Sequence, residues 1–320
     1  MKRIGVITSG GDAPGMNAAL RAVVRAALGR GSEVVGFDRG YEGILNEECR
    51  PLNSISVGGI IDRGGTILRT ARSKAFREYE GRQKAVENLH KHGIEGLVVI
   101  GGDGSLTGAK MLHEEFSFPV MGVPGSIDND IAGTDFSVGF DTAVNTAVQA
   151  IDRVRDTAYS HERVFVIEVM GRSNGFIALE AGLAGGAEAV LLPEVPFSLV
   201  DICENIGEAA GRGKKSSIVI VAEGAAKAEE ISEFICRSTG FESRAVVLGH
   251  MQRGGSPSAF DRVLALRLGA MAANRLISGY RGEMVGVDGR DLVSHPLSFV
   301  LSARRHIDPD RMVLASVMAR

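Results

Sequence analysis

The stretch Pro124-Gly125-Ser126-Ile127-Asp128-Asn129-Asp130 directly follows an apolar run at residues 120–123. A second junction of this kind lies upstream, where the apolar residues 97–100 lead into Gly101-Gly102-Asp103-Gly104-Ser105. Short apolar runs that end in glycine are typical of buried strands in a parallel sheet. Glycine-rich loops let a phosphate approach the backbone, and carboxylates can hold a metal or accept a proton, so these loops indicate phosphoryl transfer.

Strand-like and helix-like segments alternate along the chain. The pattern predicts strands at residues 4–8, 97–100, 120–123, 164–169, 218–221 and 246–248. It predicts helices at residues 15–28, from a cap at Asp141 onward, near 175–184, and at 259–277. Apolar strands with helices between them indicate an α/β fold with parallel sheets covered on both faces, where ligands bind at the carboxyl ends of the strands. The pattern also suggests a change of domain near residues 139–141.

Size and composition limit the class of protein. The 320 residues suffice for two domains, and 44% hydrophobic with 23% charged residues is the balance of a globular protein. A net charge of −3 gives no general attraction to nucleic acid or to an anionic membrane, and we expect neither as a partner. Cys49, Cys203 and Cys236 are widely spaced, so we expect reduced thiols and a cytoplasmic protein. The apolar run at residues 4–7 is too short for a signal peptide, and no run reaches the length of a membrane span.

Two glycine-rich junctions are candidate phosphate sites. Gly10-Gly11-Asp12-Ala13-Pro14-Gly15 joins a strand to a helix, where backbone N–H groups can receive a phosphate. A tight turn that needs glycine explains this junction as well. At residues 101–105, Asp103 is placed to hold Mg²⁺ that bridges nucleotide phosphates, or alternatively to cap the next helix. The same acidic loop occurs in NAD kinases and lipid kinases, so it indicates a kinase without indicating the substrate.

Ser126, Asp128 and Asp130 occupy alternate positions. If that segment is extended, the three side chains point to one side. One carboxylate can then act as a base, another can support a metal, and the hydroxyl can contact the moving phosphoryl group. The alternative is an Asp-rich surface turn, which the preceding Pro124 and Gly125 also suit.

Cations are dispersed along the chain, and each is by default a surface residue. Three of them, Arg163, Arg172 and Arg253, lie near the ends of strand-like runs, and arginine forks match phosphate oxygens in pairs. Glu223 follows another such run and can either accept hydrogen bonds from sugar hydroxyls or begin a helix.

Two cationic clusters are less decisive. Arg21 and Arg25 are four residues apart and share a helix face, and Gly211-Arg212-Gly213-Lys214-Lys215 forms a cationic turn. A solvated helix face explains the first cluster, and a helix C-terminus explains the second.

Taken in order, these motifs resemble the family of bacterial ATP-dependent 6-phosphofructokinases over essentially the whole chain. The matching stretches are residues 8–17, 101–105, 124–130, 168–172 and 249–255. The resemblance implies transfer of the γ-phosphoryl group of MgATP to the 1-hydroxyl of fructose 6-phosphate, a step of glycolysis. It also implies two doubly wound α/β domains with the active site in the cleft between them. These are a larger ATP-binding domain at residues 1–139 and 253–305, and a smaller fructose 6-phosphate-binding domain at residues 140–252 and 306–320.

The resemblance also assigns roles to single residues. Asp128 is the base that takes the hydroxyl proton, and Asp103 is a Mg²⁺ ligand with Asp130 in support. Arg172 stabilises charge on the transferred group, and Ser126 contacts it. The family usually has threonine at the place of Ser126, and we expect the loss of a methyl group to matter little.

Further contacts follow from the same motif match. The implied ATP contacts are Gly11, which also belongs to the catalytic set, Tyr41, Arg72, Ser73, Arg77, Gly102, Asp103, Gly104 and Ser105. The implied sugar-phosphate contacts are Ser126, Ile127, Asp128, Arg163, Met170, Gly171, Arg172, Glu223, Arg244, His250, Met251, Gln252 and Arg253. In the family, the arginines at the places of Arg163 and Arg244 come from a neighbouring subunit of a homotetramer.

The phosphoryl donor depends on two glycines. Pyrophosphate-dependent relatives carry aspartate at the place of Gly104 and lysine at the place of Gly125, so the glycines of this chain favour ATP. A pyrophosphate-dependent phosphofructokinase and another kinase with the same acidic loop, such as an NAD kinase, remain alternatives. A non-catalytic nucleotide-binding regulator is a further alternative, but it would be expected to lack Asp128 or Arg172.

The family has an effector site between subunits, where ADP activates and phosphoenolpyruvate inhibits. The matching residues are Arg21, Ala22, Val23, Val24, Arg25, Arg155, Gly186, Ala187, Glu188, Arg212, Lys214, Lys215 and Ser216. Ser54 stands where the family often has arginine, and Gly59 stands where it often has aspartate. We therefore expect an anionic effector to bind, and activation by ADP to be weakened or altered.

Overall fold

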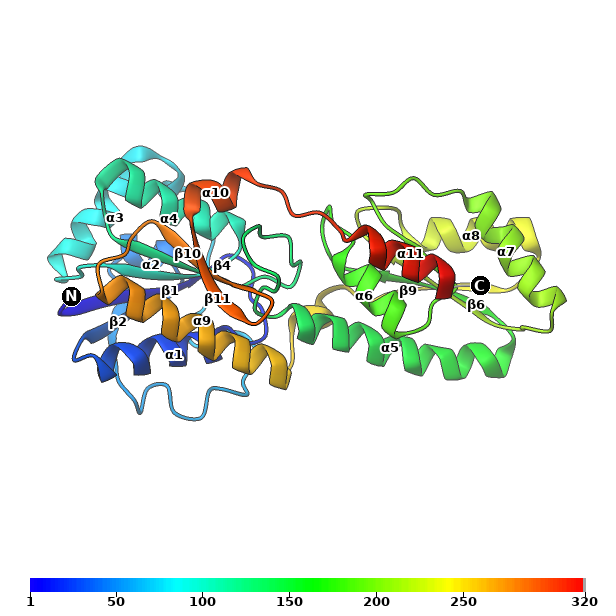
Figure 1. Cartoon of the computed structure of the whole chain (residues 1–320), viewed down its shortest axis with the longest axis horizontal. Helices are drawn as coiled ribbons and strands as arrows, with labels where there is room; N and C mark the ends of the chain where they lie inside the picture. Colours follow the sequence, from blue (N-terminus) through cyan, green and yellow to red (C-terminus); the bar gives the residue numbers. More distant parts are fainter. Residues whose placement is uncertain (319–320) are drawn as a thin grey trace. The chain divides into compact units, whose positions relative to one another are not determined.

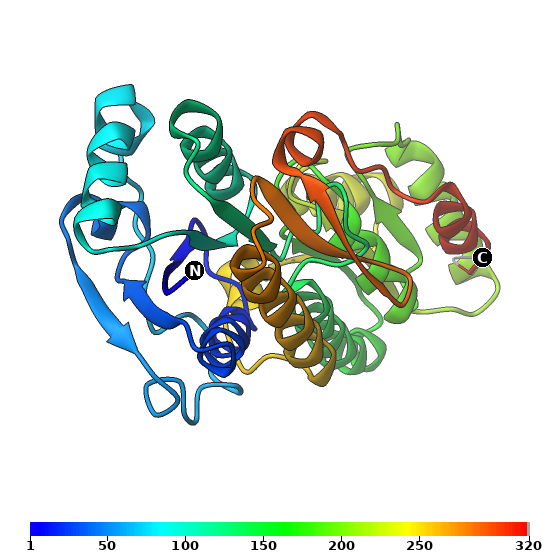
Figure 2. The ribbon, with the colours of Figure 1, turned by 60° about the vertical axis from the view of Figure 1, so that its left-hand side comes forward.

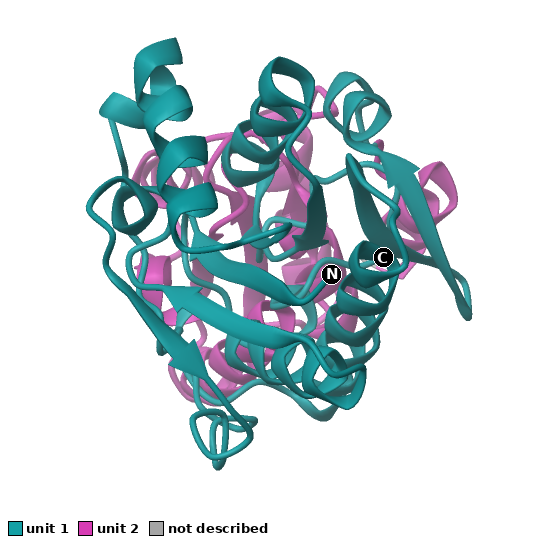
Figure 3. Cartoon of the chain, turned by 90° about the vertical axis from the view of Figure 1, so that its left-hand side faces the viewer, with its two compact units in different colours: residues 1–141, 253–305 teal, residues 142–252, 306–320 magenta. Residues whose placement is uncertain are grey.

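The structure is a computed structural model that describes residues 1–318. These residues form two compact units, coloured separately in Figure 3. Unit 1 consists of Met1–Asp141 and Arg253–Arg305, and unit 2 consists of Thr142–Gln252 together with the chain from His306. Within the described residues, no helix is both long and apolar enough to cross a membrane.

Unit 1 contains a seven-stranded sheet with the order β11-β10-β5-β4-β1-β2-β3. Its strands are β1 (Arg3–Ser9), β2 (Glu33–Phe37), β3 (Cys49–Leu52), β4 (Leu97–Gly101), β5 (Val120–Pro124), β10 (Glu283–Asp288) and β11 (Asp291–Pro296). The five inner strands are parallel, whereas the outermost strands β11 and β3 are antiparallel to their neighbours. Every residue of β4 and β5 is buried, which is why their sequences are continuous apolar runs.

Helices cover both faces of this sheet. Figures 1 and 2 show α1 (Met16–Gly29) and α9 (Ala259–Ile277) side by side on one face, with α3 (Tyr79–Lys91) and α4 (Asp103–Phe116) on the other. A Cβ at Gly269 of α9 would lie 2.5 Å from the carbonyl oxygen of Ala19, so the close packing of α9 on α1 requires glycine there. The remaining helical segments of unit 1 are α2 (Tyr41–Leu45), η1 (Ala75–Arg77) and α10 (Leu297–Ser302).

Unit 2 contains a four-stranded parallel sheet with the order β7-β8-β6-β9. Its strands are β6 (Val164–Val169), β7 (Ala189–Leu191), β8 (Ser217–Ala222) and β9 (Ser243–Val247). The helical segments are α5 (Phe140–His161), which begins at the end of unit 1, α6 (Phe176–Ala184), α7 (Leu199–Gly211), α8 (Ala228–Thr239), η2 (Gly249–Arg253) and α11 (Pro309–Met318). Val166 and Val219 share a core with Ile206 of α7 and Ile231 of α8, while α6 packs on β7 and β8 and α11 packs on α6.

The predicted fold class, α/β with largely parallel sheets covered by helices, is confirmed. Two details of the prediction are wrong. The strand expected at residues 246–248 spans Ser243–Val247, because β9 is an outermost strand and polar residues can join its ladder with β6. The helix expected from a cap at Asp141 onward already begins at Phe140, so Asp141 lies within the first turn of α5, and its carboxylate accepts a hydrogen bond from the hydroxyl of Ser258.

Residues 53–74 form a long segment without helix or strand, and one buried side chain holds its middle. Asn17, in the first turn of α1, is 1% exposed. Its Nδ2 donates to the carbonyl oxygens of Arg63 (3.0 Å) and Gly64 (3.3 Å), and its Oδ1 accepts from the backbone N–H of Ile67 (2.8 Å). The buried amide therefore makes three hydrogen bonds that hold the backbone of residues 63–67 against α1.

Replacing this amide should destabilise unit 1. We predict that Asn17→Ala lowers the free energy of unfolding by about 1–3 kcal/mol, because the three hydrogen bonds between the buried amide and this segment are lost. Urea denaturation measures the change. The control is Asn46→Ala, at an exposed asparagine whose side chain bonds only to Glu42 in the described structure, and it should cost less than about 0.5 kcal/mol. Equal losses in the two variants would contradict the assignment.

Candidate functional site

The polar loops of unit 1 follow three adjacent strands whose carboxyl ends are level. Ser9 at the end of β1 pairs with Gly101 at the end of β4, and Gly101 pairs with Pro124 at the end of β5. The N–H of Gly125 then donates to the carbonyl oxygen of Gly101 at 3.0 Å. The three predicted loops therefore leave the sheet at one edge, the edge at which ligands bind in open parallel sheets.

The loop after β4 runs directly into the N-terminus of α4. Gly102 is the N-cap residue, and Asp103 lies in the first helical turn. A Cβ on Gly104 would meet no atom within 4 Å, so the space beside this turn is open. Ser105 is 3% exposed, and its Oγ has no hydrogen-bond partner among the described residues. A helix N-terminus with open space beside it and an unused hydroxyl is suited to a phosphate.

Tyr41 supports this turn from inside unit 1. Its hydroxyl donates to the carbonyl oxygen of Ser105 at 2.6 Å, and its ring stacks on Phe76 with the centroids 3.9 Å apart. The side chain is 5% exposed, and burial raises the pKa of Tyr41, which keeps the hydroxyl protonated as a donor. Arg72 and Arg77, the nearby cations predicted to contact a nucleotide, are exposed.

The acidic loop after β5 is not extended. A turn at residues 127–128 is followed by Asn129 with a φ of 53° in the left-handed region, so the extended backbone that would place alternate side chains on one side is not present. The Oγ of Ser126 accepts a hydrogen bond from the N–H of Asp128 at 3.2 Å, and the side chain of Asp128 is 1% exposed. Ile127, predicted to contact the sugar phosphate, is fully buried.

Arg253, more than two hundred residues downstream, reaches the loop after β1. A Cβ on Gly11 would lie 2.7 Å from Nη1 of Arg253, and Nη1 donates to the carbonyl oxygen of Asp12 at 3.3 Å. The missing side chain at Gly11 therefore makes room for the guanidinium. The first and last of the predicted motifs meet within unit 1.

In unit 2, side-chain oxygens accept hydrogen bonds from three consecutive backbone N–H groups after β6. The N–H of Met170 donates to Oε1 of Gln252 at 2.8 Å, and Oε1 of Glu223 accepts from Gly171 (3.1 Å) and Arg172 (2.7 Å). Arg172 has a φ of 54°, and a Cβ on Gly224 would lie 2.2 Å from its carbonyl oxygen. Glu223 and Gln252 thus fix the turn that presents Arg172.

The other residues of the predicted sugar-phosphate set differ in accessibility. His250 and Met251 are exposed on η2, whereas Gln252 is fully buried and its Nε2 has no partner among the described residues. Gln252 therefore acts on the turn after β6 with its oxygen.

Arg163 and Arg244 both bond to the carboxylate of Glu242. Nε of Arg163 donates to Oε2 of Glu242 at 2.7 Å, and Arg244 donates to Oε1. The hydrogen bond from Arg163, followed by that from Arg244, holds the pKa of Glu242 below its usual value. The two arginines are thereby kept together on one surface of unit 2.

The residues expected at an effector site fall into separate groups. In unit 1, Arg21 donates to the carbonyl oxygen of Val57 and Arg25 is exposed, while the side chains of the intervening residues 22–24 are buried. In unit 2, the carboxylate of Glu188 pairs with Lys214 and lies 3.8 Å from Arg155. Arg212 and Lys215 instead pair with Glu208 and Glu162.

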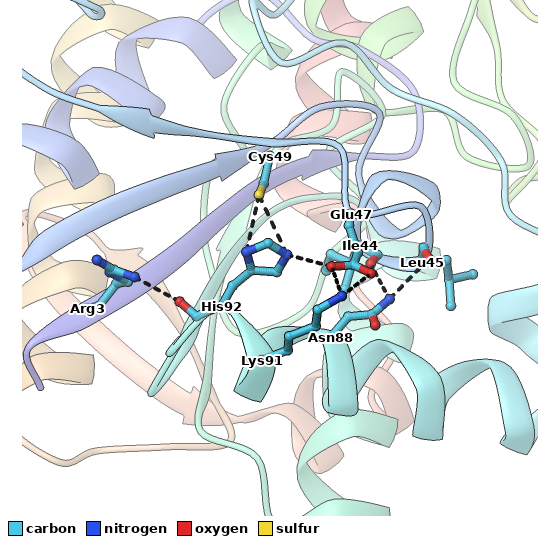
Figure 4. Close-up of polar contacts among 8 residues, drawn as sticks. All are labelled: Arg3, Ile44, Leu45, Glu47, Cys49, Asn88, Lys91 and His92. Atoms are coloured by element: carbon cyan, nitrogen blue, oxygen red, sulfur yellow. Dashed lines mark hydrogen bonds and ion pairs between the residues drawn. The ribbon is translucent and has the colours of Figure 1, made fainter.

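A further group of titratable residues lies near β3 and α3 (Figure 4). The Sγ of Cys49 is 3.7 Å from Nδ1 of His92, whose Nε2 is 2.9 Å from Oε2 of Glu47, and Lys91 bonds to the same carboxylate. Burial, followed by the charge of Glu47, raises the pKa of the Cys49 thiol and disfavours the reactive thiolate. The group therefore ties the α2–β3 connection to the end of α3. All three cysteines are free, and residues 1–318 contain no group of three or more His, Cys, Asp or Glu side chains arranged to hold a metal ion.

The two units are α/β folds with polar, glycine-rich loops at the carboxyl ends of parallel strands. Comparison with known proteins assigns the family. A family model described as phosphofructokinase matches residues 3–276. The chain is 55% identical over 319 residues to proteins of Bacillus pumilus and Bacillus mycoides named ATP-dependent 6-phosphofructokinase, with 100% of both chains covered in each case. The chain belongs to the phosphofructokinase family.

Solved structures agree with this assignment. Phosphofructokinase of Pichia pastoris in the T-state matches with a TM-score of 0.90 and 38% identity over 94% of this chain, which spans 37% of that longer chain. A pyrophosphate-dependent phosphofructokinase of Marinobacter aquaeolei matches with a TM-score of 0.86 over 100% of this chain and 92% of its own. At 22% identity, the second likeness shows a shared fold alone.

Sequence reasoning missed several residues that shape these loops. Asn129, Glu242 and Arg305 were not among the candidates, although Asn129 lies within a predicted loop, Arg305 bonds to that loop, and Glu242 bonds to the predicted Arg163 and Arg244. Asn129 lies between two predicted acids, and asparagine is one of the few residues that readily adopts a positive φ, so this signal was present in the sequence.

Glu223 provides a test of the turn after β6. We predict that Glu223→Ala lowers the free energy of unfolding of unit 2 by about 1–3 kcal/mol and speeds amide exchange at residues 171–172, because two N–H groups lose their acceptor. Glu223→Gln keeps an acceptor oxygen and should lose less. The control Glu230→Ala changes an exposed carboxylate of α8 and should leave this exchange unaltered. Unchanged exchange at residues 171–172 in Glu223→Ala would show that Glu223 does not hold the turn.

Proposed function

We propose that this chain transfers the γ-phosphoryl group of ATP to the 1-hydroxyl of D-fructose 6-phosphate, producing fructose 1,6-bisphosphate and ADP in glycolysis. The observation that carries the proposal is the level edge of β1, β4 and β5. It gathers a helix N-terminus, a buried carboxylate and a guanidinium into one set of adjacent loops. Full-length relatives at 55% identity carry the corresponding name, ATP-dependent 6-phosphofructokinase.

The roles follow from the chemistry of the side chains. Asp128, whose side chain is 1% exposed, accepts the proton of the attacking hydroxyl, as a positioned carboxylate can in general base catalysis. Arg172, presented by its fixed turn, and the guanidinium of Arg253 neutralise phosphate charge. Ser126 orients the N–H of Asp128 through its hydroxyl and lies beside the transferred group. The enzyme works by positioning and electrostatic stabilisation, without a covalent intermediate.

The donor set of unit 1 fits a magnesium ion. Mg²⁺ binds proteins through one or two carboxylates and completes its shell with phosphate oxygens and water, so two acids suffice. Asp103, beside the open space at Gly104, and Asp130 would hold it. When bound with ATP, the ion supplies positive charge that offsets the negative charge of the phosphates. The same open space at Gly104 leaves room for a nucleotide phosphate and favours ATP over pyrophosphate.

Sugar-phosphate binding belongs to unit 2. His250 and Met251 are exposed to a ligand, and the backbone of the Met170–Arg172 turn lies beside them through the bond from Met170 to Gln252. Arg163 and Arg244, held together by Glu242, face a neighbouring subunit of a homotetramer and complete its site.

Regulation and location complete the proposal. An anionic effector such as ADP or phosphoenolpyruvate binds the cations of the Arg155, Glu188 and Lys214 group. Activation by ADP is weakened, because Ser54 and Gly59 are an exposed serine and an exposed glycine where the family often has arginine and aspartate. The enzyme acts in the cytoplasm.

A steady-state assay tests the reaction. We predict turnover of MgATP and fructose 6-phosphate that depends on both substrates, with little turnover of pyrophosphate or of NAD as acceptor. The same assay with and without ADP and phosphoenolpyruvate measures regulation. Turnover with pyrophosphate and none with ATP would refute the donor assignment, and no turnover with fructose 6-phosphate would refute the reaction.

Replacing the proposed base tests its role. Asp128→Asn preserves shape but cannot accept a proton, so we predict a fall in kcat of roughly 10²–10⁴-fold with little change in the KM for fructose 6-phosphate. The matched control is Asp152→Asn, at an exposed aspartate on α5, which should retain the kcat of the unaltered chain. A kcat for Asp128→Asn within a few-fold of the unaltered chain would remove Asp128 from the role of base.

A further inference from the structure

The two acids of the loop after β5 flank a residue in an unusual conformation. Asn129 lies between Asp128 and Asp130, has a φ of 53°, and is 2% exposed. The directions of the two carboxylates relative to each other therefore depend on the backbone at Asn129. A left-handed residue of this kind persists when surrounding contacts hold it in place.

The side chain of Asn129 bonds to residues 135–137, the segment that follows the acidic loop. Its Oδ1 accepts from the N–H of Ser137 (2.8 Å) and from the hydroxyl of Ser137 (3.2 Å). Its Nδ2 donates to the carbonyl oxygen of Asp135 at 3.3 Å, and the hydroxyl of Ser137 also donates to the carbonyl oxygen of Ser126 at 2.6 Å. The loop is thus a closed unit with Asn129 at its centre.

The far side of the loop is anchored to β10 and to the turn that follows it. The N–H of Asp135 donates to the carbonyl oxygen of Val287 at 2.8 Å, and the N–H of Gly289 donates to Oδ2 of Asp135 at 2.6 Å. Thr134 accepts from the N–H of Val287 at 3.1 Å. Thr134 and Asp135 are therefore fixed to β10 and the turn after it. The position of Asp128 and Asp130 then depends on contacts that join residues 128–130 to this fixed part.

Arg305, the last residue of unit 1, bonds both to the acidic part of the loop and to its anchored part. Its Nη1 donates to the carbonyl oxygen of Asn129 at 3.1 Å, and its Nη2 donates to the carbonyl oxygen of Asp135. The first bond fixes the peptide unit between Asn129 and Asp130. Burial lowers the pKa of Arg305, while the charges of Asp135 and Asp130 act in the opposite sense. An arginine guanidinium remains charged in proteins, so both of its Nη groups can donate to the loop.

We propose that Arg305 is a positioning residue for Asp128 and Asp130. Its planar guanidinium donates to the carbonyl oxygens of Asp135 and Asn129 together, and we call this pair of bonds the clamp. The clamp rests on the contacts alone, whereas its effect on turnover rests on the proposed function. Lysine has the charge but lacks the two-pronged planar geometry, so it can replace only part of the clamp.

The test compares Arg305→Gln, Arg305→Lys and the control Arg304→Gln, which removes the same charge from the exposed neighbouring residue. Two readouts are measured on the full-length chain: amide exchange of residues 126–137, and kcat and KM with MgATP and fructose 6-phosphate. In Arg305→Gln we expect exchange in this segment to become at least tenfold faster. We expect kcat to fall about 10–100-fold with the KM for fructose 6-phosphate within about twofold, because small misplacement of reacting groups acts on kcat. Arg305→Lys should lie between, and Arg304→Gln should match the unaltered chain.

Other outcomes separate the two proposals. Unchanged exchange in Arg305→Gln overturns the clamp, whatever the activity. A fall in kcat with unchanged exchange also overturns it, because Arg305 would then act on a ligand and not on the loop. An unaltered chain that lacks activity refutes the proposed function, while the exchange data still decide the clamp. Should Arg305→Gln fail to fold, the same exchange comparison on Arg305→Lys decides it.

Discussion

The hydrogen-bonded register of β1, β4 and β5 is the constraint on which the rest of this structure depends. Their backbone groups are buried between two helical layers and must pair with each other, so the strands cannot slide. A slip of one residue would turn buried side chains to the opposite face. The carboxyl ends are consequently level, and the loops that follow them emerge together. This register is what places the loops that carry Asp103 and Asp128 next to each other.

Loops at the edge of a sheet have no regular pattern of backbone hydrogen bonds between strands. In this chain, carboxylate and amide side chains bond to the backbone of these loops instead. Asn17 pairs with the long segment after β3, and Glu223 and Gln252 pair with the turn that presents Arg172. Asn129 closes the acidic loop after β5. These contacts let glycine-rich backbones keep one shape, which matters because catalysis by positioning depends on geometry within fractions of an ångström.

The shared fold alone does not decide the phosphoryl donor. A pyrophosphate-dependent phosphofructokinase shares the fold over 100% of this chain at 22% identity. Proteins named ATP-dependent 6-phosphofructokinase are 55% identical in sequence over the full length of the chain. In the proposed function the donor is therefore assigned from single residues. Gly104, at the first turn of α4, has open space beside it that a larger acidic side chain would enter.

The sequence by itself determined the α/β class, the glycine-rich loops and the acids within them, because strand length, helical periodicity and loop composition are local properties. It also held a local signal for the turn at Asn129, because asparagine readily adopts a positive φ. It did not reveal that Arg253 lies over Gly11 or that Arg305 bonds to the loop after β5. The residues of each of these pairs are more than 170 positions apart in the sequence. Only the tertiary structure decided them, since the partner of a distant side chain is set by sheet order and register, which local patterns do not encode.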